Sequence, residues 1–394
     1  MLTFEDALAA VLALARPLSA QTVSVDESVG RAVNEAVLVR RTLPAFDVAT
    51  MDGFAVRVAD CPGTLTVVET LFAGQAPTVR LAPGQCARIM TGAALPEGAD
   101  AVVMQEKTTH QGHHVTVSDA VLLGANIRRR GEDVEAGQIL LAASRVVGLA
   151  EAGQLWSQGM TQVGVHRRPT VAIASSGDEL CPVGVESDRL VDTNSPVLSL
   201  AARRAGGIVT PLGLAPDRLD AMIALFEKGL GHDVLLTVSG ASVGDKDFTG
   251  EALKALGVDV EFWKVAMKPG KPLMVGRKGA TVVFGLPGNP TSALVSFELF
   301  VRPALRLMQG LPPTAQPLVG RLDGSLSKSA GIRLFARSRA TLREGEWWAT
   351  PLASQSSGAL ASAAGATHLV SLAPSVTEVG RGDKVQLISV AWGE

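Results

Sequence analysis

The stretch Val234-Leu-Leu-Thr-Val-Ser-Gly-Ala-Ser-Val-Gly-Asp-Lys-Asp-Phe-Thr249 joins an apolar run to a glycine-punctuated loop and then to a helical pattern. Residues 234–238 predict a buried strand, so the loop lies at that strand's carboxyl end. The run at residues 281–284 precedes a similar loop, Gly285-Leu-Pro-Gly-Asn-Pro290. Because open α/β sheets bind ligands at this edge, both loops are candidates for a binding site.

The surrounding residues, 170–310, repeat this alternation. We expect further strands at residues 170–174 and 207–214, and helices at residues 196–205, 218–230 and 290–308. The first helix would begin at Ser195-Pro196, with a capping side chain and proline in its first turn. Asp217 is most simply interpreted as the cap of the next helix. This alternation favours parallel βαβ units and a three-layer α/β domain.

The flanking segments have a different pattern. Near the N-terminus we expect a helix, because Thr3 and Asp6 form a capping box and Arg16-Pro17 ends the run. Residues 20–165 carry short valine-rich runs broken by glycine, proline and aspartate, which predict small sheets. The proline-rich residues 311–317 are typical of a linker, and the runs after them predict a small β-domain.

The composition excludes several classes of protein. With 394 residues, 47% of them hydrophobic, and a formal net charge of −2, the chain is a multidomain globular protein without an electrostatic case for binding nucleic acid or anionic membrane. No apolar run reaches the roughly 18–20 residues of a membrane span. Cys61, Cys86 and Cys181 are widely spaced, so we expect reduced thiols in a cytoplasmic protein.

Adjacent acids follow the first expected strand of the α/β domain. In Ser175-Ser-Gly-Asp-Glu-Leu180, Gly177 permits a sharp turn that leaves Asp178 and Glu179 at the strand's carboxyl end. These carboxylates could bind magnesium or hydrogen-bond a ribose or a pterin. An ordinary turn with solvated acids is an equal alternative.

The loop at residues 239–249 is more specific. Gly240 and Gly244 free the backbone to approach a ligand, while Asp245 and Asp247 precede a helix whose amides attract an oxyanion. Because two carboxylates would repel that anion, a bridging divalent cation is the simplest resolution. A surface loop that ends in an Asp cap is the alternative.

Three lysines, Lys264, Lys268 and Lys271, bracket Pro269-Gly270. If the extended segment before them persists, Lys264 and Lys268 share one face of a strand, and the Pro-Gly turn folds Lys271 back beside them. Such a cluster would hold an anion by point charges. Solvated surface lysines are the alternative.

Seven motifs in order along the chain resemble the MoeA-type molybdopterin molybdenumtransferases, a family shared with the gephyrin E domain. They are M-D-G-F-A-V (51–56), R-I-M-T-G-A (88–93), R-x-G-E-D (129–133), S-S-G-D-E-L (175–180), S-G-A-S-V-G-D-K-D (239–247), K-P-G-K-P (268–272) and G-L-P-G-N-P (285–290). Taken alone, each front-half motif would indicate only a turn.

The resemblance implies a multidomain fold of class α/β plus β. It comprises a discontinuous mixed front domain (residues 1–44 and 127–165), an inserted β-rich domain (45–126), a MoaB/MogA-like three-layer α/β domain that binds molybdopterin (166–312) and a C-terminal β-barrel (313–394). It also implies a homodimer with the active site between protomers. A MogA-type adenylyltransferase and molybdoenzyme-maturation proteins are implied as partners.

The implied reaction is the last step of molybdenum cofactor biosynthesis. Adenylylated molybdopterin and molybdate react in a Mg²⁺-dependent step that releases AMP and molybdenum cofactor. The alternatives are a non-catalytic gephyrin-like scaffold, or molybdopterin adenylylation or CinA-like nucleotide hydrolysis on the same α/β domain. The chain departs from the family pattern at Ala241 and at Lys246, which adds a positive charge beside the acids.

The resemblance also assigns roles to residues. The catalytic group comprises Asp52, Thr91, Asp133, Glu179, Asp217, Asp247, Lys264 and Lys268, of which the first three would come from the partner subunit. The substrate-binding group comprises Ser176, Gly177, Asp178, Gly240, Ser242, Gly244, Asp245, Pro287, Gly288, Asn289 and Pro290. The molybdate pocket comprises Lys268, Lys271, Pro272, Ser292, Arg337 and Ser357, and the metal ligands are Glu179, Asp245 and Asp247.

Overall fold

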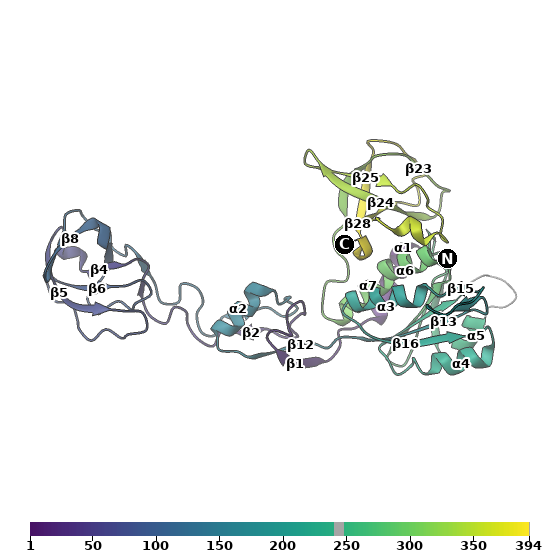
Figure 1. Cartoon of the computed structure of the whole chain (residues 1–394), viewed down its shortest axis with the longest axis horizontal. Coiled ribbons are helices and arrows are strands. Elements are labelled where there is room, and N and C mark those ends of the chain that lie inside the picture. The colour runs from purple at the N-terminus through teal and green to yellow at the C-terminus, as the bar shows by residue number, and fades with distance from the viewer. Residues whose placement is uncertain (240–247, 394) are drawn as a thin grey trace. The chain divides into compact units, whose positions relative to one another are not determined.

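The structure, a computed structural model, describes residues 1–239 and 248–393 (Figure 1). The chain divides into two compact units. Unit 1 contains Met1–Val23, Gly30–Asn34 and Gly164–Glu394, and unit 2 contains Ser24–Val29 and Glu35–Val163. The four-domain boundaries implied by the resemblance stay a prediction.

Unit 1 is built around a six-stranded sheet. Its strand order is β16 (Ile208–Ala215), β13 (Thr170–Ser176), β17 (Val234–Ser239), β21 (Thr281–Pro287), β20 (Met274–Lys278) and β18 (Asp259–Trp263). The first four strands are parallel, whereas β20 and β18 run antiparallel to their neighbours. The apolar runs therefore form the predicted parallel core, and their carboxyl ends share one edge.

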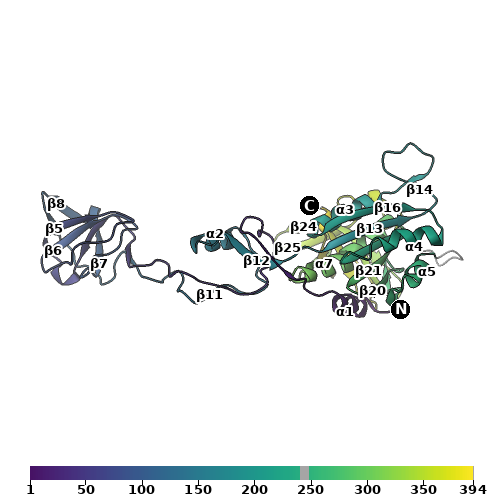
Figure 2. The ribbon, with the colours of Figure 1, turned by 90° about the horizontal axis from the view of Figure 1, so that it is seen from below.

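Helices cover both faces of this sheet (Figures 1 and 2). On one face lie α1 (Phe4–Leu14), α3 (Asn194–Arg204), α6 (Pro290–Ser296), the π-helical turn η3 (Phe297–Val301) and α7 (Arg302–Met308), and on the other lie α4 (Leu219–Glu227) and α5 (Phe248–Ala255). Side chains of β13 alternate between the two layers, as a strand requires: Val171 and Ile173 join the first core, and Ala172 and Ala174 join the second. The predicted three-layer domain is confirmed.

The helix ends partly follow local sequence. Thr3 Oγ1 accepts a hydrogen bond from the Asp6 amide at 3.1 Å, so the predicted cap of α1 is confirmed. The predicted caps at Ser195 and Asp217 are wrong, because α3 begins at Asn194, two residues before the predicted start, and Arg218 occupies the cap position of α4. The Ser195 hydroxyl instead lies 2.6 Å from that of Ser175. A partner on a distant strand has displaced the local cap.

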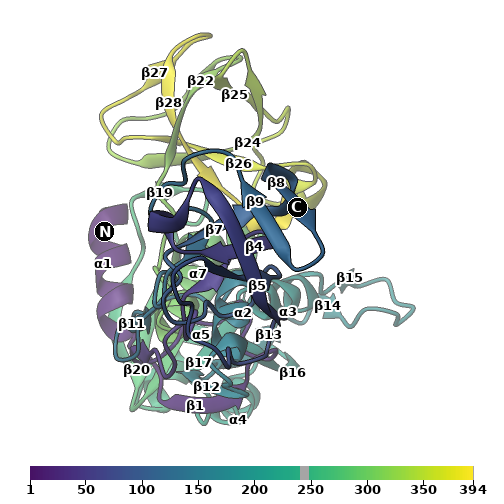
Figure 3. The same ribbon diagram turned by 90° about the vertical axis from the view of Figure 1, so that its left-hand side faces the viewer.

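A closed barrel follows the α/β layers in unit 1 (Figures 1 and 3). Its strands are β24 (Arg333–Arg343), β25 (Glu346–Pro351), β22 (Leu318–Leu322), β28 (Lys384–Ser389) and β26 (His368–Leu372), and pairing of β24 with β26 closes the ring. Leu322, Ala336, Val370 and Leu387 fill the interior. The predicted C-terminal β-barrel is confirmed.

Unit 2 contains a second six-stranded sheet. Its order is β7 (Ala101–Met104), β4 (Gly53–Val56), β6 (Gln85–Ile89), β5 (Gly63–Leu71), β9 (His114–Val117) and β8 (Thr108–Gln111). Apolar clusters on its two faces include Ala55 and Ile89 on one side and Phe54 and Leu65 on the other. The sheet accounts for the predicted β-rich part of the front half.

Short elements complete the two units. They are β1 (Ala20–Ser24), β2 (Val37–Leu38), β3 (Val48–Ala49), η1 (Val58–Asp60), η2 (Gln105–Lys107), β10 (Ile127–Arg128), β11 (Ile139–Leu141), α2 (Leu149–Ser157), β12 (Gln162–His166), β14 (Leu180–Cys181), β15 (Leu190–Val191), β19 (Met267–Lys268), β23 (Leu326–Ser327), η4 (Leu360–Ala363), β27 (Glu378–Val379) and η5 (Ala391–Gly393). Among the helices that the structure describes, none is long and apolar enough to cross a membrane.

A carboxylate at the start of β17 holds the first strands of the α/β sheet together. Asp233 accepts two hydrogen bonds of 2.6 Å from the Arg167 guanidinium, and the amide and hydroxyl of Thr170 donate to it at 2.8 Å. Burial alone would raise the pKa of Asp233, but these donors outweigh it, and the pKa lies below its ordinary value.

We expect Asp233→Asn to lower the free energy of unfolding by about 3 kcal/mol, because Arg167 loses its charged partner. Asp220→Asn is the control, since its ion pair with Arg218 is exposed to solvent and should contribute little to stability. Urea unfolding at neutral pH measures the effect of both substitutions.

The stabilisation by Asp233 should depend on pH. Because its pKa is lower in the folded than in the unfolded state, Asp233 stabilises the fold when the pH is above its unfolded-state pKa, and this effect is lost as the pH falls through its folded-state pKa. The difference in the free energy of unfolding between wild type and Asp233→Asn should therefore become smaller in acid. A difference that does not change with pH would contradict the stabilising role of the ionised Asp233 carboxylate.

Candidate functional site

Two adjoining cavities lie in unit 1 where the parallel strands end. The first, here called the sheet-edge cavity, has a volume of about 770 Å³, within the usual range for ligand sites. Its lining comes from the ends of β13, β17 and β21, the β14–β15 pair and the start of α3. The residues are Ser176, Glu179, Leu180, Leu190, Val191, Asp192, Thr193, Asn194, Val238, Ser239, Pro272, Pro287, Gly288, Asn289, Pro290 and Gly358.

The second, here called the lysine cavity, measures about 700 Å³ and reaches the barrel. It is lined by Met267, Lys268, Pro269, Gly270, Lys271, Pro272, Pro287, Asn289, Ser292, Ile332, Gln355, Ser356 and Ser357. Pro272, Pro287 and Asn289 line both cavities. A ligand that fills one cavity therefore abuts a ligand in the other.

The segment that carries the lysines does not form one strand. Strand β18 ends at Trp263, and Lys264 has a φ of +77°, so the prediction that Lys264 and Lys268 share a strand face is wrong. The chain instead folds back: the Val265 amide donates to the Lys271 carbonyl at 2.9 Å, which confirms the predicted return of Lys271. Gly270 has a φ of +98°, and a side chain there would collide with Met267.

Hydrogen bonds join the start of α6 to the barrel loop at residues 354–357. Thr291 donates through its hydroxyl to the Ser357 carbonyl at 2.6 Å and through its amide at 3.1 Å. The Asn289 amide group donates to the Ser357 hydroxyl at 3.2 Å. These bonds hold one wall of the lysine cavity against the α/β sheet.

The sheet-edge cavity contains an unsatisfied buried hydroxyl. Ser176 is 2% exposed, and its Oγ has no hydrogen-bond partner among the residues that the structure describes. Nearby, Asn194 donates to the Gly288 carbonyl at 2.8 Å, which links the start of α3 to the loop after β21. Because buried hydroxyls normally have partners, Ser176 is suited to meet a polar ligand atom.

Several predicted residues lie outside both linings. Asp178 and Asp217 hold each other's loops, since each carboxylate accepts from the other's amide, at 3.1 and 3.4 Å. Lys264 donates its amide to the Leu273 carbonyl. Arg337 is fully buried behind the barrel loop, where its guanidinium donates to the carbonyls of Ser354 and Ser356 at 3.0 and 3.1 Å.

Unit 2 brings two of its three predicted residues together. Asp52 accepts hydrogen bonds of 2.7 Å from both the amide and the hydroxyl of Thr91, and these bonds lower the pKa of Asp52. Asp133 instead pairs with Arg128. The predicted residues Gly240, Ser242, Gly244, Asp245 and Asp247 lie outside the described residues.

Sequence reasoning missed Asp192, Asn194 and Gln355. Asp192 accepts from the Ser195 amide at 3.1 Å, and Gln355 exchanges hydrogen bonds of 3.0 and 2.9 Å with the main chain of Arg337. The polar run Asp192-Thr-Asn-Ser195 directly before a helix was the available signal. Within residues 1–239 and 248–393, no three His, Cys, Asp or Glu residues are grouped as a metal site requires.

Comparisons with known proteins cover nearly the whole chain. Family models match the MoeA N-terminal region (domain I and II) over residues 2–159, a probable molybdopterin binding domain over residues 172–307 and the MoeA C-terminal region (domain IV) over residues 319–390. A molybdopterin biosynthesis MoeA protein from Pyrococcus horikoshii has a similar crystal structure, with a TM-score of 0.85, 30% identity and 99% of each chain covered.

Two curated relatives each match more than four-fifths of the chain. Molybdopterin molybdenumtransferase 2 of Mycobacterium tuberculosis is 35% identical over 397 residues, which cover 96% of each chain. Molybdopterin molybdenumtransferase of Haemophilus influenzae is 37% identical over 347 residues, which cover 82% of this chain and 85% of the relative.

We expect Thr291→Val to lower the free energy of unfolding by about 1 kcal/mol, because it removes the hydroxyl bond to the Ser357 carbonyl, leaves that carbonyl with the Thr291 amide alone, and keeps the side-chain shape. Hydrogen exchange of the amides of residues 354–357 should accelerate with it. Thr291→Ser retains the hydroxyl and serves as the control. If the amides of residues 354–357 exchange at the wild-type rate in Thr291→Val, the Thr291 hydroxyl does not hold this loop.

Proposed function

Because the chain belongs to the MoeA family of molybdopterin molybdenumtransferases, we propose that its two adjoining cavities hold adenylylated molybdopterin and molybdate for the step that releases AMP and forms molybdenum cofactor. This family membership confirms the resemblance that the sequence motifs indicate. The chain is therefore an enzyme of molybdenum cofactor biosynthesis. One observation supports the arrangement above all: Pro272, Pro287 and Asn289 separate the cavities and line both.

The lysine cavity suits molybdate. Molybdate is a tetrahedral dianion, and Lys268 and Lys271 supply two positive charges at one wall. The hydroxyls of Ser292 on α6 and of Ser357 on the barrel loop can donate further hydrogen bonds to the anion. These four residues and Pro272 form the proposed pocket.

Arg337 takes part in this pocket from behind. Its guanidinium donates to the carbonyls of Ser354 and Ser356 and so fixes the loop that carries Ser357. Burial lowers the pKa of Arg337, which reflects the cost of keeping its charge away from water. Arg337 is therefore a positioning residue for the molybdate pocket.

The sheet-edge cavity suits the pterin nucleotide. Ser176 offers a hydroxyl that has no partner within residues 1–239 and 248–393, and Asn194 fixes the loop at residues 287–290 against the start of α3. Glu179 lines this cavity and, with Asp245 and Asp247, would hold Mg²⁺ through carboxylate oxygens, the ligands this hard cation prefers. Bound Mg²⁺ would neutralise the pyrophosphate charge as its bond breaks.

The remaining assignments concern the assembly. We propose that Asp52, Thr91 and Asp133 of a partner protomer complete the cavities in a homodimer. The hydrogen bonds from the amide and hydroxyl of Thr91 orient the Asp52 carboxylate and lower its pKa. Cys61, Cys86 and Cys181 are free thiols, in keeping with the cytoplasm. A MogA-type adenylyltransferase would deliver the adenylylated pterin, and molybdoenzyme-maturation proteins would accept the product.

We expect Lys271→Gln to reduce molybdate-dependent AMP release by about 100-fold, because it removes a fixed charge beside the anion. The assay supplies adenylylated molybdopterin, Mg²⁺ and molybdate to the full chain. Lys278 is an exposed lysine at the end of β20, so Lys278→Gln is the charge-matched control and should keep the wild-type rate. A parallel assay supplies free molybdopterin instead, and consumption of the free form in place of the adenylylated form would refute the proposed reaction.

We expect Asp247→Ala to abolish molybdate-dependent AMP release, because it removes one of the three proposed Mg²⁺ ligands. Light scattering should show the same assembly as for wild type. Normal turnover by this variant would exclude the loop at residues 240–247 from catalysis.

A further inference from the structure

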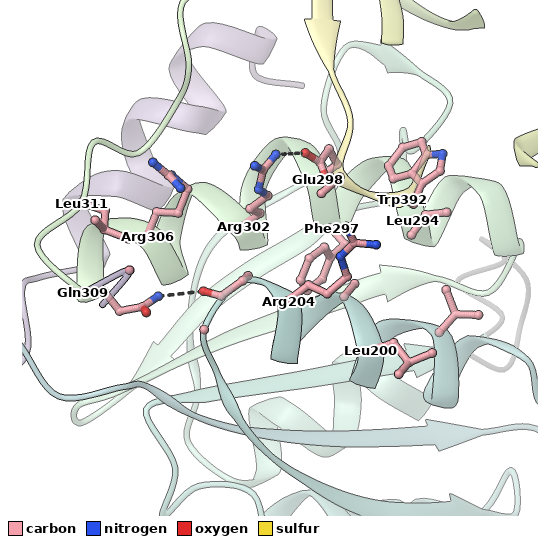
Figure 4. Close-up of a pocket in the computed structure, with 16 residues that line it drawn as sticks. Leu200, Arg204, Leu294, Phe297, Glu298, Arg302, Arg306, Gln309, Leu311 and Trp392 are labelled. Atoms are coloured by element: carbon pink, nitrogen blue, oxygen red, sulfur yellow. Dashed lines mark hydrogen bonds and ion pairs between the residues drawn. The ribbon is translucent and has the colours of Figure 1, made fainter. Parts of the chain in front are cut away.

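A third cavity of unit 1, here called the α3–α7 cavity, lies between α3 and α7 (Figure 4). It runs along α3 from Val197 to Arg204, and in the part of the chain that the structure describes it shares no lining residue with the sheet-edge cavity. The two sites are therefore distinct. The α3–α7 cavity measures about 610 Å³, which suits a small organic ligand.

Charged residues form one side of this cavity. Glu298, Arg302 and Arg306 follow each other at intervals of four along η3 and α7 and so share a face, and Arg204 lines the cavity from α3. Glu298 pairs with Arg302, and the amide of Ala391 also donates to its carboxylate. Three arginines and one glutamate leave a net charge of two positive units among the lining residues.

Two of these arginines, Arg302 and Arg306, repel each other. Burial lowers the pKa of Arg306, and the neighbouring Arg302 lowers it further, while Glu298 acts in the opposite direction. The Nε of Arg306 donates to the Pro312 carbonyl at 2.8 Å, which orients the guanidinium. An anion in the cavity would relieve the repulsion between these arginines.

Apolar and aromatic side chains form the rest of the lining. Leu294 projects from α6, Phe297 from η3 and Leu200 from α3. Trp392 contributes its indole from the C-terminal turn η5 (Figure 4). The buried indole N–H of Trp392 has no acceptor among the described residues. Such a wall offers a flat apolar surface for a ring.

The floor of the cavity is preformed. The Gln309 side chain donates to the carbonyls of Ala205 and Leu305 at 2.8 and 2.7 Å and so ties the turn after α3 to the end of α7. Gly206 in this turn has a φ of +88°, and any larger side chain there would collide with Gln309. A ligand would therefore meet a cavity whose shape is set before binding.

We propose that the α3–α7 cavity binds a small phosphomonoester that carries a planar ring. A phosphomonoester has a charge of about −1.5 to −2 at neutral pH, which matches the two net positive charges of the lining. Arginine guanidinium groups bind phosphate oxygens in a bidentate manner, and the ring would pack against Trp392 and Leu200. This assignment does not depend on the reaction proposed for the other two cavities.

Calorimetric titration of the full chain with phenyl phosphate tests the proposal. Phenol, which lacks the phosphate charge, and inorganic phosphate, which lacks the ring, are the comparison probes. We expect phenyl phosphate to bind at least about tenfold more tightly than either, because each half of the probe contributes. Binding should also change tryptophan fluorescence, and Trp392→Phe should remove that change. Inorganic phosphate binding as tightly as phenyl phosphate, or no binding at all, would overturn the proposal.

A matched pair of variants locates the site. Arg203 and Arg204 are both exposed in the last turn of α3, but only Arg204 lines the cavity. Arg204→Gln should weaken phenyl phosphate binding by about tenfold or more, and Arg203→Gln, which removes the same charge, should bind like wild type. Arg306→Gln provides an independent second test from α7. Equal affinity in wild type, Arg204→Gln and Arg306→Gln would place the probe elsewhere and refute the site.

Discussion

The site depends on main-chain and side-chain hydrogen bonds that hold the barrel against the carboxyl edge of the α/β sheet. Strand β19 leaves the α/β layers and pairs in parallel with β24 of the barrel, with Met267 opposite Arg333 and Lys268 opposite Leu334. Thr291 and Asn289 then bind Ser357 of the barrel loop. Because Lys268, Lys271 and Ser292 come from the α/β side of this junction and Ser357 comes from the barrel loop, the complete anion pocket exists only when both connections are made.

The charges of this protein are arranged locally. The whole chain has a net charge of −2, yet two cavities of unit 1 are lined by lysine or arginine. In the lysine cavity the positive groups stand on a loop shaped by positive-φ residues Lys264 and Gly270. In the α3–α7 cavity they stand on helices. Loop placement lets charges converge on a compact oxyanion, whereas helix placement spreads them along a wall beside aromatic surface.

Sequence predicted the elements of the fold well wherever hydrophobic periodicity decides them. Strands β13, β17 and β21 follow their apolar runs, and α1 begins at its capping box. Prediction was wrong where a distant partner competed with a local one. Ser195 and Asp217 suit helix caps, but they interact with Ser175 and Asp178, residues 20 and 39 positions away in the chain. The extended run at residues 261–267 ends early because Lys264 and Val265 bond to the returning chain.

The sequence by itself determined the family, the layer architecture and the candidate chemistry, because glycine spacing, apolar runs and charged motifs are local properties of the chain. Only the tertiary structure decided which groups share a cavity. Ser176 becomes an unsatisfied hydroxyl through burial, and Asn194 reaches Gly288 across 94 positions. Arg337 lies behind its loop, and the arginines of α3 and α7 face one cavity. Burial and long-range contact arise from packing, which no local pattern encodes.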